Sequence, residues 1–189
     1  EELYPDNPYH NRTHAADVLQ TMHVILVQGG MVPHYADPLT HLACYLAACV
    51  HDLEHVGLTN DYLVNTQDSL ALIYNDRSPM ENHHLATTFQ LLAQEPYNFL
   101  ARAAPKVKET VRRLVISMVL ATDMKQHFTQ MSLFKAKCHA VDEGPSDMGS
   151  PRTSHSGDSL STTLSPMLLA DDEIKTLVLA VGLKCADLG

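Results

Sequence analysis

Residues 14–30 read HAADVLQTMHVILVQGG, and this stretch decides the fold class. Its apolar residues recur at steps of three and four, which places them on one face of a helix. The two glycines that follow, Gly29 and Gly30, are typical of a helix end. The stretch therefore predicts an amphipathic helix with a buried face made by Ala15, Val18, Leu19, Met22, Ile25 and Leu26.

Two further stretches begin with strong helix-start signals. Asp37-Pro38 combines an N-cap residue with proline in the first turn. Ser78-Pro79 with Glu81 has the pattern of a capping box, and the helix it opens is predicted to run toward Gln94. For the helix after Asp37, we expect the buried residues to be Leu39, Leu42, Leu46 and Val50.

Two more helices are predicted in the second half of the chain, one opened by Pro105 and a last one beginning near Asp171. Their apolar faces are Val111, Leu114, Val115, Met118 and Val119 in the first, and Ile174, Leu177, Val178 and Val181 in the second. No segment shows sustained alternation of period two, and no Asn-Gly or Asp-Gly hairpin signal occurs. The sequence therefore predicts an all-α fold, a compact multi-helix bundle.

Composition narrows the classes of function. The 189 residues, 45% of them hydrophobic, suffice for one sizeable core. The net charge of −9 argues against a nucleic-acid polymer as partner, because binding a duplex needs a basic surface. A small anionic substrate stays possible, since bound cations can reverse the field inside one pocket. No apolar run approaches the ~20 residues of a membrane helix, so no membrane contact is expected from this segment.

The cysteines indicate a reducing environment, and one polar stretch indicates a loop. Cys44, Cys49, Cys138 and Cys185 form no CxxC pair, and we expect buried, reduced thiols in an intracellular protein. Residues 142–166 are dense in Ser, Thr, Gly, Pro and Asp, which predicts a flexible insertion loop. Its two Ser-Pro pairs, at 150–151 and 165–166, are either phosphorylation sites or parts of a surface insertion without that role.

Three pieces of sequence carry candidate metal chemistry. His10 and His14 are four residues apart at a predicted helix start, so both imidazoles can project from one side. His51 is followed directly by Asp52, and Asp187 ends an otherwise apolar helix. Imidazole nitrogens suit Zn²⁺ and carboxylates suit Mg²⁺ or Mn²⁺. Each piece alone is compatible with an ordinary surface or cap residue, whereas an unpaired buried aspartate is costly. Together they favour a two-cation centre.

At these residues the sequence resembles the class I 3′,5′-cyclic-nucleotide phosphodiesterases, within the HD superfamily of metal-dependent phosphohydrolases. Five blocks occur in the order typical of that family. They are Tyr9 to Val18, His51 to His55 with Gly57 and Asn60, Tyr74 to Asp76 with Glu81 to His84, Leu120 to Met124, and Cys185 to Leu188. The resemblance implies that residues 1–189 are part of a phosphodiesterase catalytic domain, with the insertion at 142–166, and that its bundle is of the HD type.

The resemblance also implies a role for each matching position. His14, His51, Asp52 and Asp187 would hold the tightly bound ion, taken as Zn²⁺, and Asp52 would bridge to a second ion, Mg²⁺ or Mn²⁺. His55, Glu81 and Thr122 would bind the water molecules of the second ion. His10 would be the general acid, and Tyr9 and Met124 would line the substrate pocket.

The implied reaction is hydrolysis of the 3′-phosphoester bond of cAMP or cGMP to the 5′-nucleotide. A hydroxide that bridges the two ions would attack phosphorus while His10 protonates the leaving oxygen. Two alternatives are another HD-type phosphohydrolase and a non-catalytic regulatory module that retains the fold. The family's purine-binding residues are expected beyond Gly189, so the fragment alone is expected to be weakly active or inactive. Its expected location is the cytoplasmic side of the cell, with membrane anchoring possible elsewhere in a parent protein.

Overall fold

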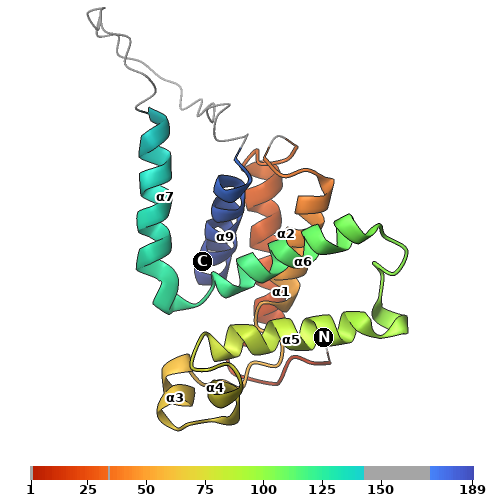
Figure 1. Cartoon of the computed structure of the whole chain (residues 1–189), viewed down its shortest axis with the longest axis vertical. Coiled ribbons are helices and arrows are strands. Elements are labelled where there is room, and N and C mark those ends of the chain that lie inside the picture. Colours follow the sequence, from red (N-terminus) through yellow and green to blue (C-terminus); the bar gives the residue numbers. More distant parts are fainter. Residues whose placement is uncertain (1, 34, 143–170) are drawn as a thin grey trace, which may run out of the picture.

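The computed structural model describes residues 2–33, 35–142 and 171–189, and these residues are helical nearly throughout (Figure 1). The elements, in chain order, are α1 (Arg12–His23) continued by the π-helix η1 (Val24–Gln28), α2 (Pro38–Val50), α3 (Asn60–Asn65), α4 (Ser69–Ile73), α5 (Pro79–Ala93), the 3₁₀ turn η2 (Glu95–Tyr97), α6 (Pro105–Leu120), the 3₁₀ turn η3 (Met124–Gln126), α7 (His127–Asp142) and α9 (Asp172–Leu188). No strand occurs in these described ranges, and the predicted all-α class is confirmed.

Four helices build the core. α1, α2 and α9 lie side by side, α6 crosses them, and α5 with the short α3 and α4 lies at one end (Figure 1). α1 begins at Arg12 because the Asn11 side chain caps it, accepting hydrogen bonds from the backbone N–H groups of Thr13 and His14. As predicted, the helical stretch stops at the glycines, with Gly29 as its cap. The buried core includes Val18, Met22, Leu26, Ala43, Cys44, Ala47, Val111, Val115, Met118, Val119, Leu179 and Leu183.

The buried faces predicted for α2 and α9 are wrong in detail. Leu42 is 39% exposed, and the other predicted α2 residues are only half-buried. The fully enclosed α2 residues are small instead: Ala43, Cys44, Ala47 and Ala48. α2 contacts α1, α5, α6 and α9, so close packing on several sides favours short side chains over one leucine stripe. In α9, too, the predicted residues are half-buried, while Leu179, Ala180, Leu183 and Ala186 are enclosed.

The predicted capping box at Ser78 is also wrong. Ser78 has a φ of 42° and its side chain makes no bond to the start of α5. Its hydroxyl donates instead to Asp123 Oδ2 at 2.6 Å, and the Glu81 carboxylate accepts from Asn60. Tertiary partners therefore take both groups that a local cap would have used.

The expectation for the cysteines holds only in part. The three cysteines with described side chains are free thiols, but Cys49 and Cys185 are exposed and only Cys44 is buried. Cys49 lies five positions after Cys44, which turns the two side chains toward different sides of α2. The side chain of Cys138 lies outside the described residues, as does the predicted insertion beyond Asp142 with both Ser-Pro pairs.

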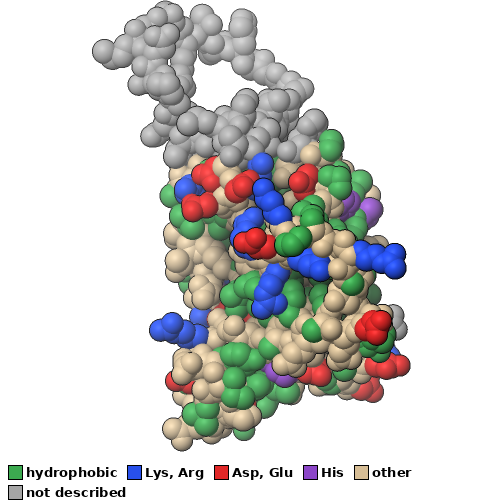
Figure 2. Space-filling model, turned by 45° about the vertical axis from the view of Figure 1, so that its right-hand side comes forward, with side chains coloured by type: hydrophobic (Ala, Val, Ile, Leu, Met, Phe, Trp, Pro, Cys, Tyr) green, Lys and Arg blue, Asp and Glu red, His purple; other side chains and the backbone are tan. Residues whose placement is uncertain are grey.

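Helix α7 was not predicted. It stands beside α9 and leads away from the bundle (Figure 1), and Phe128 at its start is 81% exposed. The described side chains of α7 pack little against the other described elements, and its sequence lacks the apolar stripe that identifies a core helix. Basic and acidic side chains are interspersed on the face shown in Figure 2. None of the helices in the described ranges has the length and apolar character needed to cross a membrane.

Candidate metal centre and active site

The four predicted metal ligands come together at one point. His14 comes from α1, His51 and Asp52 follow α2, and Asp187 lies near the end of α9. His14 Nε2 lies 3.1 Å from Asp187 Oδ1 and 3.4 Å from Asp52 Oδ2, and His51 Nε2 lies 3.3 Å and 3.2 Å from the same two oxygens. The two imidazole nitrogens are 3.3 Å apart. Four donor atoms from three helices therefore share one focus.

Local hydrogen bonds orient the side chains of His14 and His51. The Asn11 cap fixes the first turn of α1, from which His14 projects. His51 Nδ1 donates a hydrogen bond to the carbonyl oxygen of Ala48 at 2.9 Å, so in the neutral ring Nε2 keeps its lone pair for the focus. Asp52 Oδ2 is buried, and apart from its contacts with the imidazoles of His14 and His51 it has no hydrogen-bond partner among the described residues. An orphaned carboxylate oxygen beside two imidazole nitrogens fits a divalent cation.

The charges of this cluster are strongly coupled. Hydrogen bonds to Asp187 and Asp52 raise the pKa of His14 to about 9. Burial opposes the charge of His51, but the same two carboxylates outweigh it and raise its pKa to about 10. Burial also opposes the charges of the carboxylates, yet the imidazoles hold the pKa of Asp52 well below its usual range and lower that of Asp187 to about 2. Without a cation, both imidazoles are therefore positively charged at pH 7, and a bound cation would replace the additional proton on each ring.

A second group of donors lies directly beside the first. Asp52, His55 and His84 each offer an atom within 4.8 Å of the others, and His84 Nε2 is 3.9 Å from Asp52 Oδ1. His84 is buried and its Nδ1 donates to the carbonyl oxygen of Leu53, which leaves Nε2 free to accept. Burial lowers the pKa of His84 to about 3, so its ring is neutral. His84 lies in the sequence block Glu81 to His84, and no role was predicted for it; the adjacent pair His83-His84 is the signal that could have marked it.

His10 and Tyr9 lie at the side of this second group. The His10 ring stacks on that of His55 with centroids 3.8 Å apart and planes at 14°, and Tyr9 meets His10 edge-on at 4.9 Å. His55 Nδ1 accepts a hydrogen bond from the Gly57 N–H at 2.9 Å. Burial lowers the pKa of His55 to about 4, so this ring is neutral and its proton resides on Nε2. The stacked pair lines one hollow together with Asp52.

The remaining predicted residues line a hollow that His10 and Asp52 also line and that has a volume of about 410 Å³. Glu81 Oε2 accepts from the Asn60 side chain at 2.8 Å, and burial raises the pKa of Glu81 to about 7. The Thr122 hydroxyl donates to the carbonyl oxygen of Val119 at 2.8 Å, and the Met124 side chain is exposed at the rim. The predicted residues in the lining are Tyr9, His10, Asp52, His55, Glu81, Thr122, Met124 and Asp187.

The wall of the hollow also contains residues for which no role was predicted. Asn60 joins two parts of the wall, because its side chain donates to Glu81 and accepts from the Met80 N–H at 3.0 Å. Asp61 and Lys125 face each other as an ion pair, and Asp123 is buried. Asn60 and Asp123 stood inside quoted sequence blocks, whereas no local pattern joins Asp61 to Lys125.

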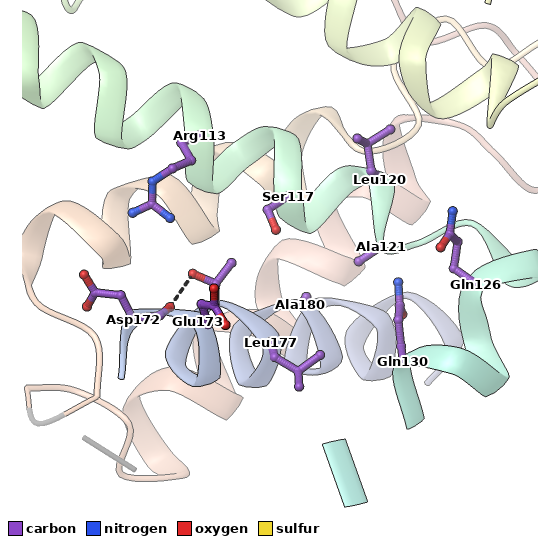
Figure 3. A pocket seen from close by; sticks show the side chains of 11 residues that line it. Arg113, Ser117, Leu120, Ala121, Gln126, Gln130, Asp172, Glu173, Leu177 and Ala180 are labelled. Atoms are coloured by element: carbon purple, nitrogen blue, oxygen red, sulfur yellow. Dashed lines mark hydrogen bonds between the residues drawn. The ribbon is translucent and has the colours of Figure 1, made fainter. Parts of the chain in front are cut away.

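Another hollow, of about 530 Å³, lies between α6, α9 and the start of α7 (Figure 3). Arg113, Gln130 and Asp172 are among its lining residues, and the hydrogen bond drawn in Figure 3 links the Thr176 hydroxyl to the Asp172 backbone. It contains none of the clustered histidines. Larger size alone therefore does not mark it as the functional site.

The fold and the site together define a class: a helical protein with a cluster of His and Asp side chains that could hold a divalent cation, as in metal-dependent phosphohydrolases. Comparison with known proteins narrows the class. The sequence model of the family described as "3'5'-cyclic nucleotide phosphodiesterase" matches residues 9–189. The chain belongs to this family. The family is metal-dependent, and the cluster of His14, His51, Asp52 and Asp187 is able to hold a metal ion.

Two curated relatives and one solved structure illustrate the similarity. The chain is 44% identical over 140 residues to "Probable 3',5'-cyclic-AMP phosphodiesterase pde-4" of Caenorhabditis elegans, covering 74% of the chain and 21% of the relative. It is 45% identical over 129 residues to the human "Dual specificity calcium/calmodulin-dependent 3',5'-cyclic nucleotide phosphodiesterase 1B", covering 68% of the chain and 24% of the relative. The crystal structure of the phosphodiesterase domain of the RhoPDE fusion protein from Salpingoeca rosetta superimposes with a TM-score of 0.81 at 30% identity.

These matches cover only part of each relative. The chain spans less than a quarter of the length of each curated relative named above. The superposition covers 99% of the chain and 51% of the solved domain.

Proposed function

We propose that this protein hydrolyses the 3′-phosphoester bond of cAMP or cGMP to give the 5′-nucleotide. The relatives carry the names of cyclic nucleotide phosphodiesterases. The observation that carries the proposal is the shared focus of His14, His51, Asp52 and Asp187, reached from three helices. An intracellular location fits it, because the cysteines with described side chains are free thiols.

The proposed ligands of the tight ion are His14, His51, Asp52 and Asp187, and two nitrogens with two oxygens suit Zn²⁺. Asp52 has its second oxygen, Oδ1, on the side of His84, and it is the proposed ligand shared with a second ion, Mg²⁺ or Mn²⁺. Bound cations of this kind lower the pKa of water and stabilise negative charge on a phosphoryl group.

The chain's own side chains have separate tasks in this proposal. His10 donates a proton to the leaving 3′-oxygen, and its stacking on His55 holds the ring in place. His55 and Thr122 bind water in the hollow, together with Glu81, whose pKa near 7 allows it to hold or release a proton there. Tyr9 and Met124 contact the nucleoside at the rim.

The test compares metal content with turnover. The protein, freed of metal by chelation, is titrated with Zn²⁺ and then with Mg²⁺ or Mn²⁺, and calorimetry measures how many ions bind. Release of phosphate in a coupled assay is then followed with cAMP, cGMP and an aryl phosphodiester. We expect tight Zn²⁺ binding and a low rate of cyclic-nucleotide hydrolysis that depends on the second ion, because residues 1–189 are expected to form only part of the catalytic domain. Metal binding with turnover of the aryl phosphodiester alone would instead indicate another phosphohydrolase.

A further inference from the structure

An ion pair spans the mouth of the 410 Å³ hollow. The Lys125 ammonium contacts the Asp61 carboxylate directly, and both residues line the hollow. Lys125 belongs to η3, just before α7, and Asp61 to the first turn of α3. The pair therefore joins two walls that come from distant parts of the chain.

The charges of this lining are unequal. Lys125 is the only lysine or arginine among the described residues that line the hollow. The carboxylates in the same lining are Asp52, Asp61, Glu81, Asp123 and Asp187. An anion that enters would meet acidic walls, and only Lys125 offers it a permanent positive charge on the way to the ligand cluster.

The backbones that carry this pair are fixed, while the charged ends are free to exchange partners. The Lys125 N–H donates to Asp123 Oδ1 at 2.9 Å, and Asp123 is held in turn by Ser78 at 2.6 Å. Asp61 follows Asn60, which is bonded to Glu81. The side chains of Lys125 and Asp61, in contrast, are 53% and 71% exposed. Exposed pairs of this kind are weak, so a competing anion can displace the carboxylate.

We propose that Lys125 is a substrate-binding residue, whose ammonium leaves Asp61 to attract the anionic phosphate of an incoming cyclic nucleotide. Asp61 holds the lysine over the mouth between encounters and competes with the substrate for it. This inference rests on the proposed function, because it takes a phosphodiester anion as the ligand. It predicts that removing the lysine and removing the aspartate have opposite effects on substrate capture.

Two variants test the opposition in the metal-loaded protein. For Lys125→Gln we expect kcat/KM for cAMP to fall about two- to fivefold, mostly through KM, and the Kd of a fluorescent cAMP analogue to rise equally. For Asp61→Asn we expect kcat/KM to rise about two- to fivefold, because the lysine no longer has a competing partner. Lys125→Arg, which keeps the charge, should stay close to the unmodified protein.

Ionic strength gives a second measurement. Raising salt from about 50 to 200 mM shortens the range of electrostatic attraction, so kcat/KM of the unmodified protein should fall. The fall should be smaller for Lys125→Gln. An equal salt dependence in both proteins would overturn the proposal.

The controls use another pair with the same charges. Lys175 and Asp172 pair on α9 at 3.9 Å and do not line this hollow. Lys175→Gln and Asp172→Asn should leave kcat/KM and its salt dependence unchanged. Equal effects of these controls, or shifts of Lys125→Gln and Asp61→Asn in the same direction, would refute the role of Lys125. If the unmodified, metal-loaded protein neither binds nor hydrolyses a cyclic nucleotide, the proposed function itself fails.

Discussion

Two sets of opposite charges meet at one hollow, which Asp52 and Asp187 line from the inner set and Asp61 and Lys125 from the outer set, and the two sets differ in burial. In the inner set, the side chains of His14, His51, Asp52 and Asp187 are between 0% and 19% exposed. In the outer set, Asp61 and Lys125 are more than half exposed. Burial strengthens electrostatic interactions and makes an unpaired charge costly, whereas solvent weakens the outer pair. The inner set can therefore hold a cation tightly, and the outer pair can open.

The largest effect is expected from removing one proposed metal ligand of the inner set. Asp187→Ala deletes the oxygen that lies between His14 and His51, so we expect the Zn²⁺ affinity to fall by more than about 100-fold and turnover to be lost. Metal analysis after dialysis, together with calorimetry, checks this. Asp172→Ala, near the other end of α9, is the matched control and should retain full metal content. Full occupancy in Asp187→Ala would show that Asp187 is not a ligand.

A second variant separates proton donation from metal binding. His10 lies beside the inner set, and among the described residues its ring contacts His55, His14 and Tyr9 rather than a carboxylate of that set. We expect His10→Ala to keep the metal and to lower kcat about 10²–10⁴-fold, the usual contribution of a positioned proton donor. His23→Ala, at the end of α1, removes a histidine outside the hollow and should change kcat little. Loss of metal in His10→Ala would instead assign His10 to the ligand set.

The pH dependence of stability measures how strongly the charges of the inner set are coupled. Without metal, His14 and His51 have folded-state pKa values near 9 and 10, above the ordinary 6.5. Their contribution to stability is therefore complete below about pH 6.5 and is lost as pH rises through 9 to 10. Asp187, with its pKa lowered to about 2, contributes above about pH 4 and loses this on acidification.

Urea unfolding at pH 5.5, 7.5 and 9.5 measures this effect. The metal-free protein should lose free energy of unfolding between pH 7.5 and 9.5, where His14 and His51 lose their charge while His55 and His84, with pKa values near 4 and 3, stay neutral. The Zn²⁺-loaded protein should lose less over this range, because its imidazoles are already deprotonated ligands. A metal-free protein equally stable at pH 7.5 and 9.5 would contradict the coupling of the two imidazoles to the carboxylates.

The inner set was predictable from sequence and the outer pair was not, for a physical reason. His10, His14 and the His51-Asp52 pair have spacings that point several donors the same way, and Asp187 is conspicuous as an acid at the end of an apolar helix. The family resemblance supplied the candidates for water binding, His55, Glu81 and Thr122. Lys125 and Asp61 follow no spacing rule, since tertiary folding alone brings η3 to α3. For the same reason Ser78 was assigned to a local cap, although Asp123 takes its hydroxyl.

Helix prediction had a related weakness. One apolar face identifies a helix that packs on one side, which succeeded for α1 and α6. α2 is enclosed by four helices, so small residues such as Ala43 and Ala47 carry its tightest contacts while Leu42 is partly exposed. α7 packs too little to need an apolar stripe and was not detected. Whether a buried face was predicted correctly therefore depended on how many other helices contact that helix, which the periodicity of its apolar residues does not encode.

The smallest expected effect concerns the stability of the outer pair. Lys125→Gln removes an exposed ion pair, so the free energy of unfolding should change by less than about 1 kcal/mol. Asp61→Asn should do the same apart from a slight loss at the first turn of α3, where a negative charge favours the helix dipole. Urea unfolding of both variants measures this. A larger loss would mean that the pair holds α3 and η3 together structurally, and the lysine would then be unable to leave Asp61 at little cost.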